Sequence, residues 1–369
     1  MNKKIVHVLR NDALGGVENS TLEIVKYFLS QGIQQEVVIL SSLANGVSSY
    51  FIKENVSTTS IPFSKTQLLK FVVAYWVYMQ KSKPDIQLVS GVFGLHALLN
   101  ILARLAGVKR CWTYLVMKPP GKGLSYFVQY FLSQLSRLFS SGEISVSNYL
   151  KYEFHQLMKL PLKNIHVIHR WRDIAAISEE AELARQRRDS MSPVIITISR
   201  LDWMKDLPNL INAFAIFVKT EPEAIFYIVG DGPMKIQLEK QVERLGILES
   251  VKFLGHRSDI SNLLGGGDIF IFSTSQTEGI GGVMIEAMAA GIPIVCTDVG
   301  PCQEVLNNGE GGIIVPIGNP QFIAAAMLDL WKDPNKRKEL SKRANKLAAD
   351  RYSKERCGKE LINLLFESN

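Results

Sequence analysis

The stretch that most constrains this chain runs from Ser273 to Gly291 and reads STSQTEGIGGVMIEAMAAG. The apolar segment before it is typical of a buried strand, and the residues after its glycines have the composition of a helix. Glycines let a ligand approach the backbone closely, and the unpaired N–H groups at a helix start suit a phosphate group. Two carboxylates, Glu278 and Glu286, would repel that phosphate, but they are suited to accept hydrogen bonds from hydroxyls. The stretch therefore predicts a site for a nucleotide sugar.

The pattern that begins at Glu278, E-G-x-G-x-x-x-x-E-A-M-A-x-G-x-P, resembles the signature of retaining glycosyltransferase family 4, also called glycosyl transferases group 1. Enzymes of this family have the GT-B architecture, in which two Rossmann-like domains face each other across a cleft. The resemblance implies that Glu286 accepts hydrogen bonds from the ribose of the donor and that Glu278 holds hydroxyls of the transferred sugar. It also implies that the backbone N–H groups of Gly281, Gly282 and Val283 bind the diphosphate.

A second motif, S-R-L-D-W-M-K-D, follows an apolar strand expected at 194–199 and contains Arg200 and Lys205. Ligands bind at the carboxyl ends of strands in an α/β sheet, where a guanidinium and an ammonium can neutralise a diphosphate. The pair matches the family pattern R-L-x-x-x-K, which implies that both side chains stabilise the leaving diphosphate as the glycosidic bond breaks. We therefore predict catalytic roles for Arg200, Lys205 and Glu278.

Two further motifs extend the predicted donor site. Gly15 and Gly16 resemble the Gly-Gly loop that opens family members and faces the donor phosphate and the acceptor, although a simple tight turn accounts for them as well. The segment 251–256 resembles the part of the family whose backbone reads the nucleotide base, and this adds Leu254 and His256 to the site. For a lone histidine, a polar surface position is an equally valid interpretation.

Expected strands and helices alternate along the whole chain, which is typical of parallel sheets covered by helices. The chain has 369 residues, more than a single core usually supports. We therefore predict an α/β fold with two Rossmann-like, doubly wound domains. The expected boundaries are 1–175 for an acceptor-side domain and 176–352 for a nucleotide-sugar-binding domain, with the junction in the charged segment between Asp173 and Pro193. By resemblance, residues 353–369 form a helix that crosses back to the first domain.

The composition excludes several classes of protein. Apolar residues make up 47% of the chain and charged residues 21%, as in a folded globular protein. The net charge of +7 indicates anionic partners, and no nucleic-acid-binding signature is present, so phosphate and lipid are favoured over nucleic acid. The longest apolar run, 71–79, is too short to span a bilayer, and residues 1–10 lack the features of a signal peptide. The four scattered cysteines are expected to be reduced thiols in the cytoplasm.

Two aromatic-rich helical segments are expected in the first half, at 67–80 and 124–139, with Lys118 and Lys122 just before the second. They either cover the sheet of the first domain or contact a membrane. We predict weak, peripheral association with the anionic inner face of the cytoplasmic membrane. We expect no metal or other cofactor, because no D-x-D motif follows a strand and the positive charges of the donor site can replace a divalent ion.

The sequence departs from the family pattern on the acceptor side. Members often carry a histidine near the transferred sugar, but the corresponding position falls near Leu115, where no histidine is found. Where many members read V-I-P-N-G-V-D, this chain reads V-I-H-R-W-R-D. His169, Arg170 and Arg172 of this segment could instead line the cleft at the domain junction. The resemblance therefore does not identify the acceptor.

We predict a retaining glycosyltransferase that moves a sugar from a nucleoside diphosphate-sugar donor to a glycan or lipid-linked acceptor, in the biosynthesis of a bacterial surface polysaccharide such as lipopolysaccharide. Two alternatives stay open. One is a catalytically silent, nucleotide-sugar-binding partner of a transferase complex, which turnover of a donor by the purified chain would exclude. The other is a sugar-nucleotide epimerase of the GT-B type, against which the Glu278 and Glu286 motif argues when combined with Arg200 and Lys205.

Overall fold

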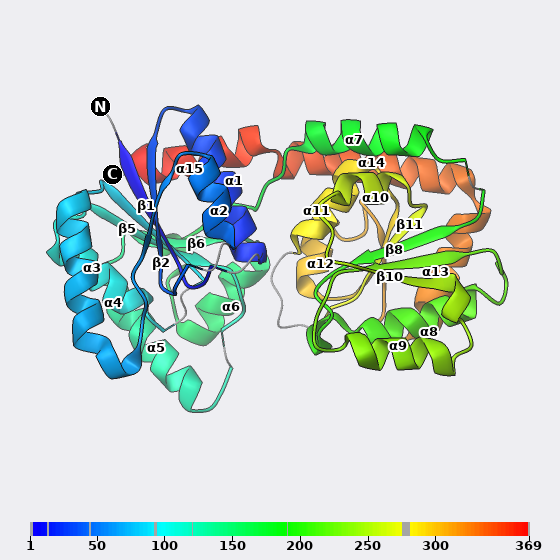
Figure 1. Ribbon diagram of the computed structural model, residues 1–369, viewed down its shortest axis with the longest axis horizontal. Coiled ribbons are helices and arrows are strands. Elements are labelled where there is room, and N and C mark those ends of the chain that lie inside the picture. The colour runs from blue at the N-terminus through cyan, green and yellow to red at the C-terminus, as the bar shows by residue number, and fades with distance from the viewer. Residues whose placement is uncertain are drawn as a thin grey trace. The chain divides into compact units, whose positions relative to one another are not determined.

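A computed structural model describes residues 3–12, 15–43, 46–91, 94–119, 121–189, 191–274 and 281–367. The chain divides into two compact units, which Figure 1 shows as ribbons. The first unit contains the residues up to Trp171 and those from Lys354 to the end, and the second contains Arg172–Ser353. The first crossing between the units therefore lies just before the charged segment in which the junction was predicted.

The first unit is built around a seven-stranded parallel sheet with the order β3-β2-β1-β4-β5-β6-β7. Its strands are β1 (Lys4–Leu9), β2 (Gln34–Ile39), β3 (Ser57–Ser60), β4 (Ile86–Ser90), β5 (Arg110–Leu115), β6 (Gly142–Ser145) and β7 (Ile165–Val167). Its α-helices are α1 (Gly16–Ser30), α2 (Val47–Lys53), α3 (Leu68–Ser82), α4 (His96–Leu105), α5 (Leu124–Ser136), α6 (Asn148–Met158) and α15 (Lys354–Glu367). The strand order reverses between β1 and β4, which is the point where ligands bind in sheets of this kind.

The second unit repeats this topology with a six-stranded parallel sheet in the order β10-β9-β8-β11-β12-β13. Its strands are β8 (Val194–Ile198), β9 (Ile225–Val229), β10 (Val251–Gly255), β11 (Ile269–Phe272), β12 (Ile294–Thr297) and β13 (Ile313–Val315). Its α-helices are α7 (Ile174–Gln186), α8 (Leu207–Phe217), α9 (Lys235–Arg244), α10 (Ile260–Gly265), α11 (Gly282–Ala290), α12 (Gly300–Val305), α13 (Pro320–Lys332) and α14 (Pro334–Tyr352). Here the order reverses between β8 and β11. The predicted α/β class with two Rossmann-like domains is confirmed.

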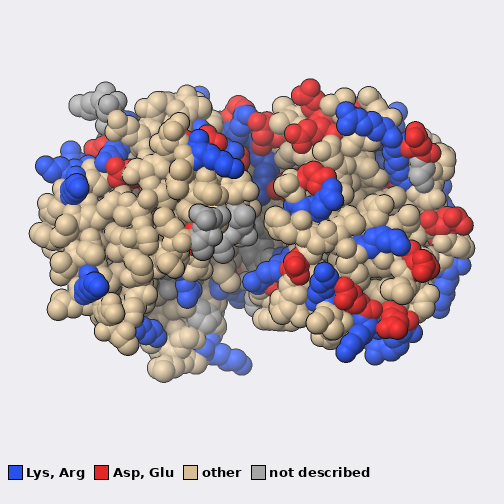
Figure 2. All heavy atoms as spheres, viewed as in Figure 1, with Lys and Arg blue, Asp and Glu red and all other residues tan. Residues whose placement is uncertain are grey.

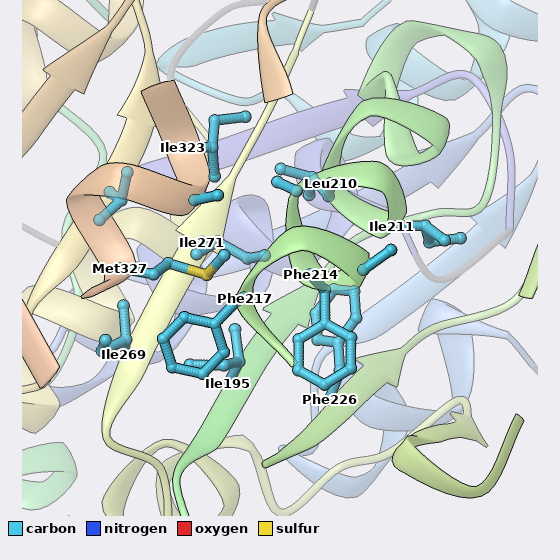
Figure 3. Close-up of a cluster of buried hydrophobic side chains, with 14 of the residues drawn as sticks. Ile195, Leu210, Ile211, Phe214, Phe217, Phe226, Ile269, Ile271, Ile323 and Met327 are labelled. Carbon is cyan, nitrogen blue, oxygen red and sulfur yellow. The ribbon is translucent and has the colours of Figure 1, made fainter. Parts of the chain in front are cut away.

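Both faces of the second sheet are buried, so its strands are apolar at successive positions. Ile195, Ile269 and Ile271 point into the cluster of Figure 3, where they pack with Phe214 and Phe217 of α8. Their neighbours in the sequence, such as Ile196 and Phe270, are buried in a separate cluster on the opposite face. Continuous apolar runs of this kind are typical of parallel strands covered by helices on both sides.

The C-terminal helix α15 packs within the first unit. Its residues Cys357, Leu361 and Leu365 are fully buried in the same cluster as Ile24 and Phe28 of α1. A helix from the end of the chain thus covers part of the sheet formed at its beginning.

The Gly358→Ala substitution is expected to lower the free energy of unfolding by about 1–3 kcal/mol, the usual cost of overpacking. A Cβ at position 358 would lie 2.3 Å from the ring of Tyr27, which is held edge-on against Trp171. The ring must therefore move for α15 to stay in place. Thermal unfolding of the variant would measure the loss, with Gly121→Ala as the control because a Cβ at position 121 meets no atom within 4 Å. Equal melting temperatures for the two variants would contradict the prediction.

Three regions differ from the predictions made from the sequence. The charged segment after Asp173 was predicted as the domain junction, but it forms α7, which packs against α10 and α11 within the second unit. Two short elements, α2 and β3, and the longer α6 were not predicted. The strand β3 is formed by Ser57–Ser60, which has no apolar side chain to mark it, and it lies at the edge of the sheet.

In the described part of the chain, no helix is both long and apolar enough to cross a membrane.

Candidate donor site

The second sheet brings two of the predicted motifs together at the point where its strand order reverses. Arg200 follows β8, and Ser273 follows β11, and these two strands are hydrogen-bonded neighbours. The carboxyl ends of parallel strands lie at the same edge of a sheet, and a crevice forms where neighbouring connections diverge. The residues after β8 and β11 therefore border one candidate ligand site.

Arg200 is exposed to solvent, but a buried aspartate holds its side chain. Its side chain is 65% exposed and forms an ion pair with Asp202, whose own side chain is only 5% exposed. Asp202 also accepts a hydrogen bond from the N–H of Met204 through Oδ1 at 3.0 Å, and this begins a short 3₁₀ helix, Trp203–Lys205. The buried aspartate thus holds both the guanidinium and the turn that follows it.

Lys205 is fixed toward the end of β11. Its Nζ lies 5.3 Å from the ring centroid of Phe272, within the range of a cation–π contact. The next residue, Asp206, has a φ of 43°, which is rare for a residue other than glycine and turns the chain sharply into α8. Ser273 donates a hydrogen bond from Oγ to Oδ2 of Asp206 at 3.3 Å. These contacts connect the Lys205 turn to the start of the loop after β11.

Helix α11 begins at the end of this loop, and its N-cap residue has no side chain that could cap it. Gly281 is its N-cap residue and makes no side-chain capping bond, and Gly282 and Val283 form the first turn. The N–H groups of such a turn carry partial positive charge and favour an anion. Gly281, Gly282 and Val283 thus lie at the start of α11, and their contact with a diphosphate stays a prediction.

Glu286 lies one turn further along α11 and is paired with an arginine. Its Oε1 accepts a hydrogen bond from Nε of Arg172 at 2.5 Å, and the two side chains are 21% and 14% exposed. Arg172 is anchored by its backbone, whose N–H donates to the carbonyl of Tyr352 at 3.0 Å. A Cβ on Gly282 would lie 2.2 Å from Nη2 of Arg172, so the guanidinium extends over the start of the helix.

Arg172 is the site residue that the sequence motif did not indicate. The sequence placed it in the departure from the V-I-P-N-G-V-D pattern, as a residue that could line a cleft, and did not predict its pairing with Glu286, 114 residues away. The other predicted carboxylate, Glu278, lies in 275–280, outside the described residues. Its role stays a prediction from the sequence.

The segment predicted to read the base lies at the same edge of the sheet. Leu254 belongs to β10 and packs partly buried against the core, and His256 follows the strand and is exposed. The strand β9 separates β10 from β8. Leu254 and His256 thus lie at the edge of the sheet that carries the candidate site, two strands away from β8, and their contact with a base stays a prediction.

The first unit has its own candidate site where its strand order reverses. Gly15 is the N-cap of α1 and Gly16 its first residue, and the carbonyl of Gly16 accepts a hydrogen bond from Nη1 of Arg170 at 3.2 Å. A cavity beside them is lined by residues of α1 and by strand ends of the sheet, among them Ser20, Ser90, Tyr114, His169 and Arg170. The buried hydroxyl of Tyr114 has no hydrogen-bond partner among the described residues. The cavity therefore offers polar groups to a ligand.

Burial raises the pKa of Glu18 in the first turn of α1, and the charge of Arg170 opposes this shift. The loop of Gly15 and Gly16 is thus close to the carboxyl group of Glu18 and to the guanidinium of Arg170. The Gly-Gly motif alone did not indicate either of them.

Comparison with known proteins agrees with this arrangement in both halves of the chain. The family model of glycosyl transferases group 1 matches residues 178–347, and that of glycosyltransferase family 4 matches residues 14–176. The N-acetyl-alpha-D-glucosaminyl L-malate synthase of Bacillus anthracis is 29% identical over 60% of this chain and 58% of its own length. The lipopolysaccharide core biosynthesis glycosyltransferase LpsE of Rhizobium meliloti is 29% identical over 47% of this chain and 50% of its own length. The chain thus matches about half of the length of these curated relatives.

Solved structures match over nearly the full chain. HepE of Anabaena in complex with UDP superposes with a TM-score of 0.86, covering 99% of this chain and 100% of that one at 21% identity. TarM superposes with a TM-score of 0.79 at 14% identity and covers 99% of both chains. At these identities the likeness shows the fold, which is the GT-B fold of two Rossmann-like domains. The two family models together match almost the whole chain, which is therefore a member of glycosyltransferase family 4.

Proposed function

We propose that this protein is a retaining glycosyltransferase that moves a sugar from a nucleoside diphosphate donor to a glycan or lipid-linked acceptor, in the assembly of a bacterial surface polysaccharide. One observation carries the proposal: Arg200, Lys205 and the start of α11 lie around the strand reversal of the second sheet, with Glu286 one turn away. Cationic groups for a diphosphate next to a carboxylate for hydroxyls fit a nucleotide sugar.

In this proposal the second unit binds the donor. Arg200, Lys205 and the N–H groups of Gly282 and Val283 bind the diphosphate and stabilise its charge as the bond to the sugar breaks. Glu286 accepts hydrogen bonds from the ribose. A structure of HepE contains UDP-glucose, and the same fold in this chain supports a donor of this class.

The first unit is proposed to bind the acceptor at the cavity beside Gly16 and Arg170. Relatives named for lipopolysaccharide core biosynthesis and for Vi polysaccharide biosynthesis support a surface glycan as the product. The four cysteines are buried free thiols, which suits a reducing compartment, and we propose that the protein acts in the cytoplasm.

A screen of sugar nucleotides tests the function. The purified chain is expected to hydrolyse one donor slowly and to release the free nucleoside diphosphate, because water can replace the acceptor in the site. Binding of a nucleoside diphosphate without any turnover, with or without candidate acceptors, would favour the silent-partner alternative. Absence of binding would contradict the donor site itself.

We propose that catalysis needs no divalent metal ion, because Arg200, Lys205 and the start of α11 supply the positive charge that such an ion provides elsewhere. Donor hydrolysis is therefore expected to keep its rate in excess EDTA. The measurement compares initial rates in EDTA with rates in added Mg²⁺ or Mn²⁺. A loss of activity in EDTA that Mg²⁺ or Mn²⁺ restores would contradict this proposal without contradicting the transferase function.

A further inference from the structure

Three helices of the first unit, α3, α4 and α5, form a layer on one side of its sheet, with α4 in contact with both of the others (Figure 1). Their inner sides pack on the strands: Phe71, Tyr75 and Met79 of α3 and Leu99 of α4 are buried in one cluster. A helix in this position usually carries polar residues on its outer side. The outer sides of α3 and α5 do not follow this rule.

The outer side of α5 is apolar along its whole length. Leu124 is 80% exposed, Phe127 66% and Phe131 67%, and Leu138 just beyond the helix is 76% exposed. Spacings of three, four and seven residues place such side chains on one face of a helix. Two phenylalanines and two leucines thus face solvent along one stripe.

The outer side of α3 repeats the pattern. Leu69 is 77% exposed, and Val73, Trp76 and Val77 follow at spacings of three and four residues, each more than 40% exposed. At the end of α4, Leu105 is also exposed. Several large apolar side chains exposed on neighbouring helices mark an interaction site in a folded protein. We call this surface, formed by the outer sides of α3, α4 and α5, the apolar face.

The charge around the apolar face identifies the partner that it suits. Residues 55–142, which contain all three helices, include ten lysines and arginines and a single acidic residue, Asp85. The rest of the chain has 32 basic and 34 acidic residues, so the net positive charge of the protein comes from this stretch. Asp85 itself accepts a hydrogen bond from the backbone N–H of Lys4 at 3.0 Å.

Basic side chains surround the apolar stripes. Lys65, Lys70 and Lys81 on or beside α3, and Lys122 and Arg137 at the two ends of α5, are all exposed. In Figure 2 the surface over these helices is mostly tan with separate blue groups. Lys118 differs, because it donates a hydrogen bond to Glu153 at 3.0 Å and is therefore neutralised by its partner.

We propose that the apolar face docks on an anionic lipid bilayer, with the side chains of α3 and α5 in the interfacial region and the basic residues on lipid headgroups. Apolar side chains flanked by lysine and arginine are the combination that binds such an interface. A second copy of the chain suits the face less well. A twofold dimer would place the same basic surface against itself, with almost no acidic residues to offset the repulsion. The inference does not depend on the donor site, and it gives a reason for the acceptor-side unit to meet a lipid-linked acceptor.

Flotation with vesicles tests the docking. The full chain is expected to float with phosphatidylglycerol-containing vesicles and not with phosphatidylcholine alone, and the bound fraction should fall as salt rises, because salt screens the lysines. The double substitution Phe127→Ser and Phe131→Ser should weaken binding about tenfold or more, because two large apolar side chains no longer enter the interface. The matched control is Ile236→Ser and Leu248→Ser, which removes two side chains of similar exposure, 68% and 56%, from the second unit.

Tryptophan fluorescence gives a second measurement. Trp76 lies on the apolar face and is 41% exposed, whereas Trp203, which is 69% exposed, lies in the second unit. Vesicles with brominated acyl chains should quench the wild-type emission, and Trp76→Phe should remove most of the quenching, whereas Trp203→Phe should not.

Equal binding of the two double variants, or no binding by the wild-type chain at low salt, would overturn the proposal. Sedimentation equilibrium tests whether a second copy of the chain covers the apolar face instead. A wild-type dimer that the substitutions at Phe127 and Phe131 dissociate would show that a second copy covers the face. Melting temperatures close to that of the wild type would show that the exposed substitutions leave the fold intact.

Discussion

The Arg172→Ala substitution is expected to weaken the binding of a nucleoside diphosphate about 10- to 100-fold, or about 1.4–2.8 kcal/mol. Two effects act in the same direction. Glu286 would keep a partly buried negative charge without its 2.5 Å partner, and that charge would repel the diphosphate. The positive charge over the start of α11 would also be lost. A carboxylate has room for several hydrogen bonds, so Arg172 can hold Glu286 while the ribose binds its other oxygen.

Calorimetric titration of UDP into the wild type and variants measures this effect. The Arg172→Lys substitution keeps the charge but loses the planar guanidinium, so it should give an intermediate affinity. The control is Arg185→Ala, since Arg185 also bonds to α11, but at the far end of the helix, through the carbonyl of Ala290 at 2.8 Å. Unchanged UDP binding by Arg172→Ala would contradict a role for Arg172 in the donor site, and tighter binding would show that the ion pair closes the site against the ligand.

Two further titrations separate the effects. Uridine has no phosphates. If Arg172 acts only by orienting Glu286, the Arg172→Ala substitution should therefore lower the affinity for uridine as much as the affinity for UDP. If Arg172 acts only through its charge near the diphosphate, uridine binding should not change. Gly282→Ala provides an independent approach, because the new Cβ would lie 2.2 Å from Nη2 of Arg172 and would displace the guanidinium.

The fold was predictable wherever the residues themselves encode burial. The strands of the second unit, such as β8 and β11, are runs of Ile, Val and Phe that are buried on both faces, and their positions were predicted within a residue or two. The strand β3 and the helices α2 and α6 lack such a run. A local signal for α6 was present: Ser147 caps the helix by accepting a hydrogen bond from the N–H of Leu150 at 3.0 Å.

The site was predictable only in part, because motifs report local residues and not the partners they meet. The positions of Arg200, Lys205 and Glu286 near one strand reversal follow from the topology of a doubly wound sheet. The pairing of Glu286 with Arg172 does not, because it depends on how α7 and α14 bring the start of the second unit beside α11. The helices α3 and α5 were predicted as apolar helices. Which of their sides face solvent depends on how they pack against the rest of the unit, which the sequence alone does not give.

Glu286 and Glu278 are expected to have different effects on binding and on rate, and two substitutions should separate them. Glu286→Ala removes the group expected to hold the ribose, far from the bond that breaks. It should weaken both the donor and the free nucleoside diphosphate by about 1.5–3 kcal/mol, the usual contribution of a hydrogen bond to a charged group. The same substitution leaves Arg172 without its carboxylate, so part of the loss is offset by the freed positive charge near the diphosphate.

Glu278→Gln should instead leave the affinity for the free nucleoside diphosphate almost unchanged, because that ligand has no sugar for Glu278 to contact. It should lower turnover by about 100-fold or more, since contacts that strengthen as the sugar becomes cation-like affect the rate and not ground-state binding. Calorimetry of UDP with both variants, beside their rates of donor hydrolysis, distinguishes the roles. Weaker UDP binding by Glu278→Gln with normal binding by Glu286→Ala would reverse the assignment. If neither substitution changed binding or rate, the prediction of a nucleotide-sugar site from the Ser273–Gly291 stretch would be wrong.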